Sequence, residues 1–386
     1  MANPASLALQ VGNANMGTAS RLPQTSAKPT AGAPFPRLSR KARNRGYVVT
    51  FTGAGGGFAQ LVTQPLKPVG GWLRQIVLTI IASGGTGTAA VAAADAPWNV
   101  IQTLMFRDPL GQPIINVDGY GLYEIQKYSG QLGQAKMMDP SQLPSYSAIA
   151  TSGNFTIKLQ LPLELDSSGY CSLNSMNAAA TAQLDIQFAA STTVYSTPPT
   201  GVPQLQVTAE QNFWAAPIQN PAIGPPDAGA TAQWTKTGGQ TSVASATNVL
   251  VASPRTGTYI HTLITILRDA NGVRQDNYPL TDLTFQVDGV PVFLERFDDR
   301  VDDMARWTDG ISRDTGVAVW SFRDAVQPLI SVADTHDLLL QTTPATLLEV
   351  GGTFQTITAA PGSLTFYTGE LWPTNAARIP WSHLAQ

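Results

Sequence analysis

The chain has 386 residues, of which 43% are hydrophobic and only 13% are charged, with 34 glycines, 28 prolines and one cysteine. So little charge combined with so many turn-forming residues favours a packed, loop-rich β protein. It argues against a coiled coil, a helical repeat and a disordered chain. The single cysteine, Cys171, rules out an intramolecular disulfide framework and a cysteine-based zinc site.

The charges are unevenly distributed along the chain. The net charge is −3, but the first acidic residue is Asp95, and residues 1–94 carry nine basic side chains and no carboxylate. The rest of the chain has 14 basic and 26 acidic residues, a net charge of −12. This asymmetry predicts a basic segment that meets an anionic partner, with a merely solvated tail as the alternative.

Residues 1–45 are expected to form an extended arm. They are rich in Ala, Pro, Ser, Thr, Asn and Gly and show the period of neither a strand nor a helix. Such segments stay extended until a partner orders them. The end of the arm holds five cations within nine residues: Arg37, Arg40, Lys41, Arg43 and Arg45.

From Gly46 onward, short β-branched runs and alternating apolar and polar residues predict strands. In the first half of the chain the predicted strands lie at 47–51, 72–81, 155–161, 184–188 and 205–208. A proline-rich connection at 215–229 follows. The pattern then restarts, with strands predicted at 248–251, 259–267, 280–287, 317–322, 337–341 and 364–371.

Helical periodicity is scarce. Over 292–307, apolar residues recur at spacings of 4, 4, 3 and 3, which predicts one amphipathic helix. Those apolar residues are Phe293, Phe297, Val301, Met304 and Trp307. A weaker helix is predicted over 119–130, from Tyr120, Tyr123 and Lys127.

The two halves of the chain look like copies of one unit. The tripeptides that begin at Leu104 and Gly111 recur as those that begin at Leu283 and Gly289, at offsets of 179 and 178 residues. In each half, a predicted helix follows this pair. The chain is therefore expected to hold two units of about 170 residues with about eight strands each. Such a unit is compatible with a jelly roll, an immunoglobulin-like sandwich or a barrel.

No arrangement of residues indicates an enzyme. The three histidines, His261, His336 and His383, are far apart and none lies in a metal-binding motif. The acidic pairs at 298–299 and 302–303 alternate with arginines and suit a solvated helix face. We therefore expect no catalytic residue, no metal and no cofactor.

The layout resembles the double jelly-roll major capsid proteins of tailless icosahedral viruses with an internal membrane, the tectivirus-like bacteriophages. The likeness rests on the arrangement of segments rather than on a sharp motif, and these segments are 72–81, 97–123, 155–165, 184–188 and 364–367. The resemblance implies an all-β fold of two eight-stranded jelly rolls side by side, each with a short helix in a connecting loop. It implies that three chains form a pseudo-hexagonal capsomer.

The expected organisation follows from the repeat and the resemblance together. It comprises a basic arm at 1–45, a first jelly roll at 46–214, a linker at 215–229, a second jelly roll at 230–373 and a tail at 374–386. The expected function is that of a structural major capsid protein, made in the host cytoplasm and located in the virion shell. The alternative is a carbohydrate- or receptor-binding β-sandwich protein of a virion spike.

The resemblance also suggests partners. They are further copies of the chain, in a homotrimer and in neighbouring trimers, and minor capsid, vertex or membrane proteins. In that family the N-terminal segment lies at the inner base of the shell. The five cations of the arm are therefore expected to face an anionic surface, namely phospholipid headgroups, packaged DNA or an acidic minor capsid protein. Neutralisation of a neighbouring subunit's acidic base is the alternative for the same cations.

Overall fold

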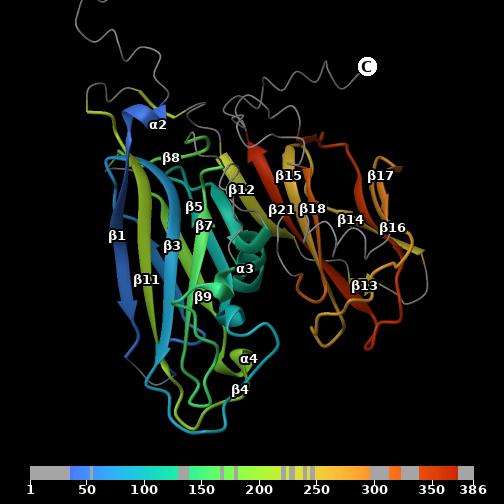
Figure 1. Cartoon of the computed structure of the whole chain (residues 1–386), viewed down its shortest axis with the longest axis horizontal. Coiled ribbons are helices and arrows are strands. Elements are labelled where there is room, and N and C mark those ends of the chain that lie inside the picture. Colours follow the sequence, from blue (N-terminus) through green and yellow to red (C-terminus); the bar gives the residue numbers. More distant parts are fainter. Residues whose placement is uncertain are drawn as a thin grey trace, which may run out of the picture.

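The fold is known from a computed structural model of the chain. The residues it describes are 35–52, 55–128, 139–165, 169–177, 181–218, 223–225, 231–237, 241–243, 248–295, 313–322 and 339–372. Within this part of the chain, β-strands dominate and helices are short (Figure 1).

The first half of the chain folds into a sandwich of two four-stranded sheets. One sheet has the order β1 (Arg40–Thr50), β11 (Gln204–Ala215), β3 (Gly71–Ser83) and β7 (Phe155–Pro162), and β8 (Leu173–Asn174) extends it beside β3. The other has the order β2 (Leu61–Pro65), β9 (Gln183–Phe188), β5 (Ile101–Arg107) and β6 (Pro113–Val117). The helix α3 (Gly119–Tyr128) follows β6 directly.

The second half repeats this sandwich. One sheet has the order β12 (Thr231–Thr237), β21 (Gly362–Trp372), β15 (Tyr259–Arg268) and β18 (Val317–Ser321). The other has the order β14 (Asn248–Ser253), β20 (Leu348–Thr353), β16 (Leu283–Val287) and β17 (Val290–Glu295). Two short strands, β13 (Thr241–Val243) and β19 (Leu340–Gln341), pair with β21 and β15.

The remaining elements are short and lie in the connections. They are α2 (Phe35–Leu38), β4 (Val91–Ala92), η2 (Trp98–Val100), η3 (Pro140–Gln142), α4 (Ser191–Val194) and β10 (Tyr195–Thr197). The two-stranded pair of β4 and β10 lies at one end of the first sandwich (Figure 1).

The two sandwiches have one topology. When the eight principal strands of each are numbered in chain order, the sheets read 1-8-3-6 and 2-7-4-5 in both. This is the double-sheet arrangement of a jelly roll. The predicted repeat is confirmed in detail, because Leu104 in β5 and Leu283 in β16 both occupy the fourth strand. The prediction of two eight-stranded jelly rolls in one chain is confirmed.

The two rolls share a continuous sheet. β6 at the edge of the first roll pairs in parallel with β12 at the edge of the second, through Trp234 with Ile115 and Thr235 with Asn116. Sheet 2-7-4-5 of the first roll thereby continues into sheet 1-8-3-6 of the second, and α3 lies between the rolls (Figure 1). The rolls thus form one block that shares backbone hydrogen bonds and side-chain packing.

The predicted boundary of the N-terminal arm is wrong. The described part of the chain opens with α2 at Phe35, and β1 starts at Arg40, so the first roll begins before Gly46. All eleven residues of β1 lie along β11, with a bulge between Arg45 and Tyr47. The backbone of β11 supplies hydrogen-bond partners for the backbone of this polar segment. The segment therefore forms a strand although its sequence shows no hydrophobic alternation.

The predicted helix over 292–307 is wrong in its first turn. Asp288 and Gly289 have φ angles of 52° and 77°, as a two-residue type I′ hairpin turn requires. The chain therefore reverses at once into β17, where Phe293 pairs with Phe285 of β16. Residues 296–312 lie outside the described part of the chain. The predicted helix over 119–130 is confirmed as α3 for residues 119–128.

Candidate functional site: the seam and the basic edge strand

The five predicted cations lie together at one edge of the first roll. Arg37 is in α2, and the other four are in the first half of β1, with side chains exposed to solvent: Arg40, Lys41, Arg43 and Arg45. β1 is the outermost strand of its sheet. None of Arg37, Arg40, Arg43 and Arg45 forms an ion pair with a described residue. Exposed cations on an edge strand oppose pairing with a second copy of the same strand and remain available to an anionic partner.

Three of these cations share one face of the sheet. In the register with β11, Lys41 lies opposite Trp214, Arg43 opposite Asn212 and Arg45 opposite Glu210. Cross-strand partners point to the same side. Because the bulge before Tyr47 reverses the alternation, Tyr47 faces the sandwich interior while Arg45 faces outward.

An aromatic cluster fixes the start of β1. Phe35 packs edge-on against Trp72 and Trp214, with ring centroids 5.2 and 5.7 Å away. The Lys41 ammonium lies 5.0 Å from the centroid of Trp214, and the buried Arg74 guanidinium, ion-paired with Glu164, lies 4.9 Å from it. Burial and the nearby Arg74 charge lower the pKa of Lys41. Lys41 is therefore partly a structural residue, whereas Arg43 and Arg45 have no such contact.

The seam between the rolls is built around α3. All ten residues of this helix are buried, and it lies between sheet 1-8-3-6 of the second roll and the strands of the first. Gly121 allows the close approach, because a Cβ at this position would lie 1.9 Å from Cε1 of Tyr367 in β21. Trp234, Ile264 and Tyr367 of the second roll join the hydrophobic core of the first roll.

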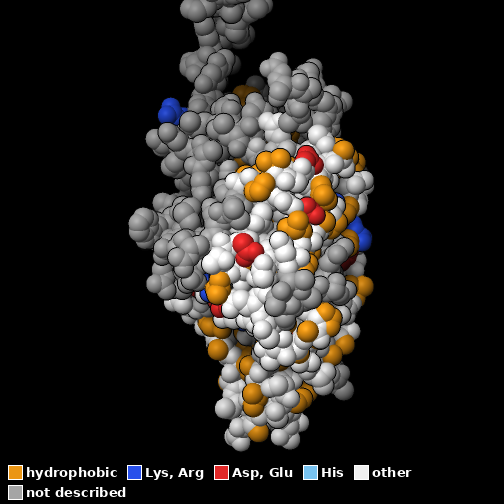
Figure 2. All heavy atoms as spheres, turned by 90° about the vertical axis from the view of Figure 1, so that its right-hand side faces the viewer, with side chains coloured by type: hydrophobic (Ala, Val, Ile, Leu, Met, Phe, Trp, Pro, Cys, Tyr) orange, Lys and Arg blue, Asp and Glu red, His pale blue; other side chains and the backbone are white. Residues whose placement is uncertain are grey.

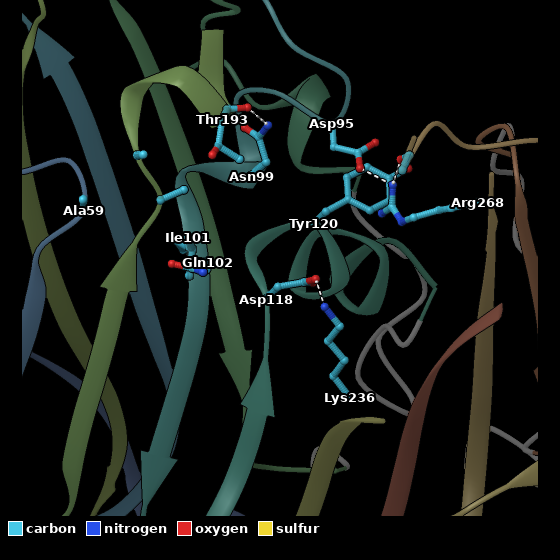
Figure 3. Close-up of a pocket in the computed structure, with 13 residues that line it drawn as sticks. Ala59, Asp95, Asn99, Ile101, Gln102, Asp118, Tyr120, Thr193, Lys236 and Arg268 are labelled. Atoms are coloured by element: carbon cyan, nitrogen blue, oxygen red, sulfur yellow. Dashed lines mark hydrogen bonds and ion pairs between the residues drawn. The ribbon is translucent and has the colours of Figure 1, made fainter. Parts of the chain in front are cut away.

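Asp118 joins the start of α3 to the second roll. Its carboxylate accepts the backbone N–H of Gly121 at 2.6 Å, which caps the helix, and the Tyr367 hydroxyl at 2.9 Å. The ammonium of Lys236 in β12 lies 2.7 Å from its second oxygen (Figure 3). One side chain therefore serves as a helix cap and as two inter-roll contacts.

A second link comes from the long loop between β3 and β5. Asp95, at a φ of 67°, forms ion pairs with Arg268 and Arg274 of the second roll, the latter at 2.6 Å. Both guanidinium groups lie over the Tyr120 ring of α3, at 5.4 and 4.6 Å from its centroid. The first half contains a longer loop here than the second, and the structure shows that this loop carries the link.

The third link is buried. Lys127 of α3 is 2% exposed and lies 2.6 Å from Asp314 of the second roll. Glu124, one turn earlier, is wholly buried, and neither of its oxygens has a hydrogen-bond partner of normal geometry in the described part of the chain, although Tyr120 and Asp314 lie close enough to interact with it. Burial, and then the negative charge of Asp314, raise the pKa of Glu124 well above its usual value, against the opposing effect of Lys127.

A pocket of about 470 Å³ opens beside the seam (Figure 3). Its charged walls are Asp95, Asp118, Lys236 and Arg268, which pair with one another across it. Tyr120 also lines it, and the first roll adds Ile101 together with small and amide side chains such as Ala59, Asn99, Gln102 and Thr193.

The described residues contain no group of three or more His, Cys, Asp and Glu side chains that could hold a metal ion. His261 is buried against Trp234, and Cys171 is buried. The acidic pairs at 298–299 and 302–303, together with His336 and His383, lie outside the described residues. No described helix is long and apolar enough to cross a membrane.

The opposite side of the molecule has a different surface. Figure 2 shows the side of the second roll that carries β14, β16 and β17, where uncharged side chains predominate among scattered hydrophobic and a few acidic ones. Asp288 and the apolar side chains of Leu250, Val290 and Val292 are exposed there. The basic strand β1 thus lies at one end of the block and this sheet at the other (Figure 1).

Comparison with solved structures identifies the fold. The major capsid protein of STIV, the Sulfolobus Turreted Icosahedral Virus, matches 90% of this chain and 99% of its own, with a TM-score of 0.61 at 16% identity. PBCV-1 VP54, fitted into a reconstruction of the virophage Sputnik, matches 86% of this chain and 94% of its own, with a TM-score of 0.60 at 12% identity. The Faustovirus major capsid protein matches 86% of this chain and 90% of its own, with a TM-score of 0.53 at 8% identity.

No protein-family model matches the chain, and no curated protein matches its sequence. The likeness therefore lies in the fold alone. The chain has the double jelly-roll fold found in these viral major capsid proteins, as the sequence analysis predicted.

Proposed function

We propose that this chain is the major capsid protein of an icosahedral virus, with a structural rather than an enzymatic role in the virion shell. One observation carries the proposal. The two rolls of this chain, which share one topology, match viral capsid chains over nearly the whole length of those chains. A seam held by α3, Asp95 and Asp118 keeps the rolls in one block. A shell subunit needs such rigidity, because both rolls must meet their neighbours in a fixed geometry.

The assembly unit is a homotrimer. Three chains of two similar rolls supply six similar blocks, which suit a pseudo-hexagonal capsomer. Permanent interfaces of this kind commonly bury more than ~2,000 Å². Size-exclusion chromatography with light scattering, followed by negative-stain microscopy, tests this proposal. A trimer that assembles into sheets or particles is the expected result. A protein that stays monomeric at high concentration and binds glycans would instead support the receptor-binding spike protein.

The basic strand engages an anionic partner on the inner side of the shell. Arg40, Arg43 and Arg45 on the edge strand and Arg37 in α2 are exposed and form no ion pair with a described residue, and this supports the role. Near an anionic surface each cation contributes on the order of 1 kcal/mol, within a Debye length of ~8 Å. The partner is phospholipid headgroups, packaged DNA or an acidic capsid protein.

The test replaces Arg37, Arg40, Arg43 and Arg45 with glutamine and leaves Lys41 on Trp214. Binding to phosphatidylserine vesicles, to duplex DNA and to assembled shells is then measured at increasing salt. The variant should lose the salt-dependent part of binding to one of these partners. A matched control replaces Lys67 and Lys158, which lie elsewhere on the first roll, and should bind as the unaltered chain does. Equal binding by both variants, or protease cleavage of this strand on the outside of intact particles, would contradict the proposal.

A further inference from the structure

The seam contains an acid whose environment suits its protonated form. Glu124 lies in the middle of α3, 0% exposed, and the helix itself is buried between the two rolls. Neither carboxyl oxygen has a hydrogen-bond partner of normal geometry in the described part of the chain. An ionised carboxylate in such a place is strongly unfavourable, because it has lost its water and the interaction with the Tyr120 hydroxyl offsets only part of that loss.

The charges around Glu124 do not balance if it is ionised. Asp314 approaches it from the second roll, and the buried ammonium of Lys127 is already 2.6 Å from Asp314. Two carboxyl groups thus share one cation. The other titratable groups around it are the hydroxyls of Tyr120, Tyr123 and Tyr128 on α3 itself. Arg274 from the second roll lies on the Tyr120 ring and is paired with Asp95. Arg313 lies next to Asp314 in the chain.

We propose that Glu124 is a proton-binding site of the seam, and that the bound proton is part of what holds the two jelly rolls together. With the proton bound, Glu124, Asp314 and Lys127 together carry no net charge. Without it, one uncompensated negative charge lies between α3 and the second roll. The link between Lys127 and Asp314 then competes with Glu124 for the same ammonium, and the packing of α3 against the second roll weakens.

The direction of the pH effect follows from linkage. Burial and the Asp314 charge raise the pKa of Glu124 in the folded chain well above the value of 4.5 expected when unfolded. Between these two values the folded chain binds more protons than the unfolded chain. Stability therefore falls as pH rises through this window. The seam should be tightest in mild acid and loosest in base, which is the reverse of an ordinary salt-bridged carboxylate.

The test is the variant Glu124→Gln, which keeps the size and shape of the side chain but cannot ionise. Proton release on thermal unfolding is measured at pH 7 by calorimetry in buffers of different ionisation enthalpy. The unaltered chain should release more protons than Glu124→Gln, by up to one. Its unfolding temperature should also fall relative to the variant by about 2 °C per pH unit between pH 5 and 8. Glu210→Gln, on the outward sheet face of the first roll, is the matched control and should follow the unaltered chain.

Hydrogen exchange locates the effect in the native, unaltered chain. After correction for the intrinsic pH dependence of exchange, the amides of α3 should lose protection between pH 5 and 8, while those of β7, in the same roll, keep theirs. Equal proton release by the unaltered chain and Glu124→Gln would overturn the proposal. Loss of protection spread evenly over both rolls would also overturn it, because the proton would then not act at the seam. The calorimetric result is independent of whether the protein forms capsids.

Discussion

The last strands of the two rolls, β11 and β21, occupy the same place in their sheets but are buried differently. Along β11, buried and partly exposed residues alternate from Leu205 to Gln211. In β21, every residue from Phe366 to Leu371 is buried. One face of β11 meets solvent, whereas both faces of β21 are covered, one by its own roll and the other by α3 of the first roll. Burial on both faces removes the alternation of buried and exposed positions, and in β21 it encloses the polar residues Thr368 and Glu370 as well as apolar ones.

This difference shows that two rolls of one topology have separate tasks. The second roll uses the outer face of sheet 1-8-3-6 to hold the first roll. In the first roll, the outward side of β11 stays partly exposed from Gln206 to Glu210, and Arg43 and Arg45 lie along the edge of this sheet. A copy of one unit has therefore become asymmetric through a few additions, namely Asp95 in a longer loop and Gly121 in α3.

The largest expected effect comes from Gly121→Ala, which tests whether α3 lies against β21. Alanine in a helix is ordinarily favoured over glycine by about 1 kcal/mol. Here its Cβ would lie 1.9 Å from the Tyr367 ring, which is buried and held by Asp118. Overpacking therefore wins, and the free energy of unfolding should fall by about 3 kcal/mol. Denaturant unfolding measures this change.

A double-mutant cycle with Tyr367→Ala identifies the cause of that loss. If the two residues touch, the double variant Gly121→Ala/Tyr367→Ala should be more stable than the sum of the single losses predicts. Additive losses would mean that the helix does not rest on this ring. The comparison between β11 and β21 would then lose its explanation.

Much of this fold could be predicted from the sequence, because it depends on local patterns. The alternation over 155–161 identifies a strand with one buried face, and that strand is β7. The repeat beginning at Leu104 and Leu283 identifies two equivalent units. The hairpin at Asp288 and Gly289 was open to prediction as well, since this dipeptide between apolar runs is a strong turn signal. Over residues 292–295 the helical spacing gave the wrong element, because a short apolar run fits both the helix and the strand period.

The seam could not be predicted, because it depends on contacts between distant parts of the chain. Asp95 meets Arg274 across 179 positions, and Lys127 meets Asp314 across 187. In the sequence each of these residues is an ordinary charged side chain. The cations of β1 were found from their density, but their strand conformation comes from pairing with β11, which lies more than 160 residues away.

The link through Asp95 joins the two rolls and distinguishes them from two rolls that merely lie side by side. Asp95→Asn removes the charge that Arg268 and Arg274 share, both of which are mostly buried. Two neighbouring guanidinium groups then repel each other, and we expect a loss of about 2 kcal/mol in the free energy of unfolding. Asp185→Asn is the matched control, because Asp185 pairs with the half-exposed Arg107 within the first roll at 3.2 Å. That change should cost less than about 1 kcal/mol. Equal losses would show that the loop does not act as a link.

The smallest expected effect has the opposite sign and returns to β11 and β21. Thr368 in β21 is wholly buried, and its hydroxyl has no hydrogen-bond partner in the described part of the chain. Thr208 in β11 is partly exposed on the outward face. Thr368→Val should therefore stabilise the chain by about 1 kcal/mol, since the replacement keeps the shape and removes an unsatisfied group. Thr208→Val should change stability by less than about 0.5 kcal/mol. Thermal unfolding of both variants side by side measures the difference. If Thr368→Val instead destabilises the chain, the Thr368 hydroxyl has a hydrogen-bond partner. The burial of β21 on both faces would then not leave this group unsatisfied, and the contrast with β11 would be smaller.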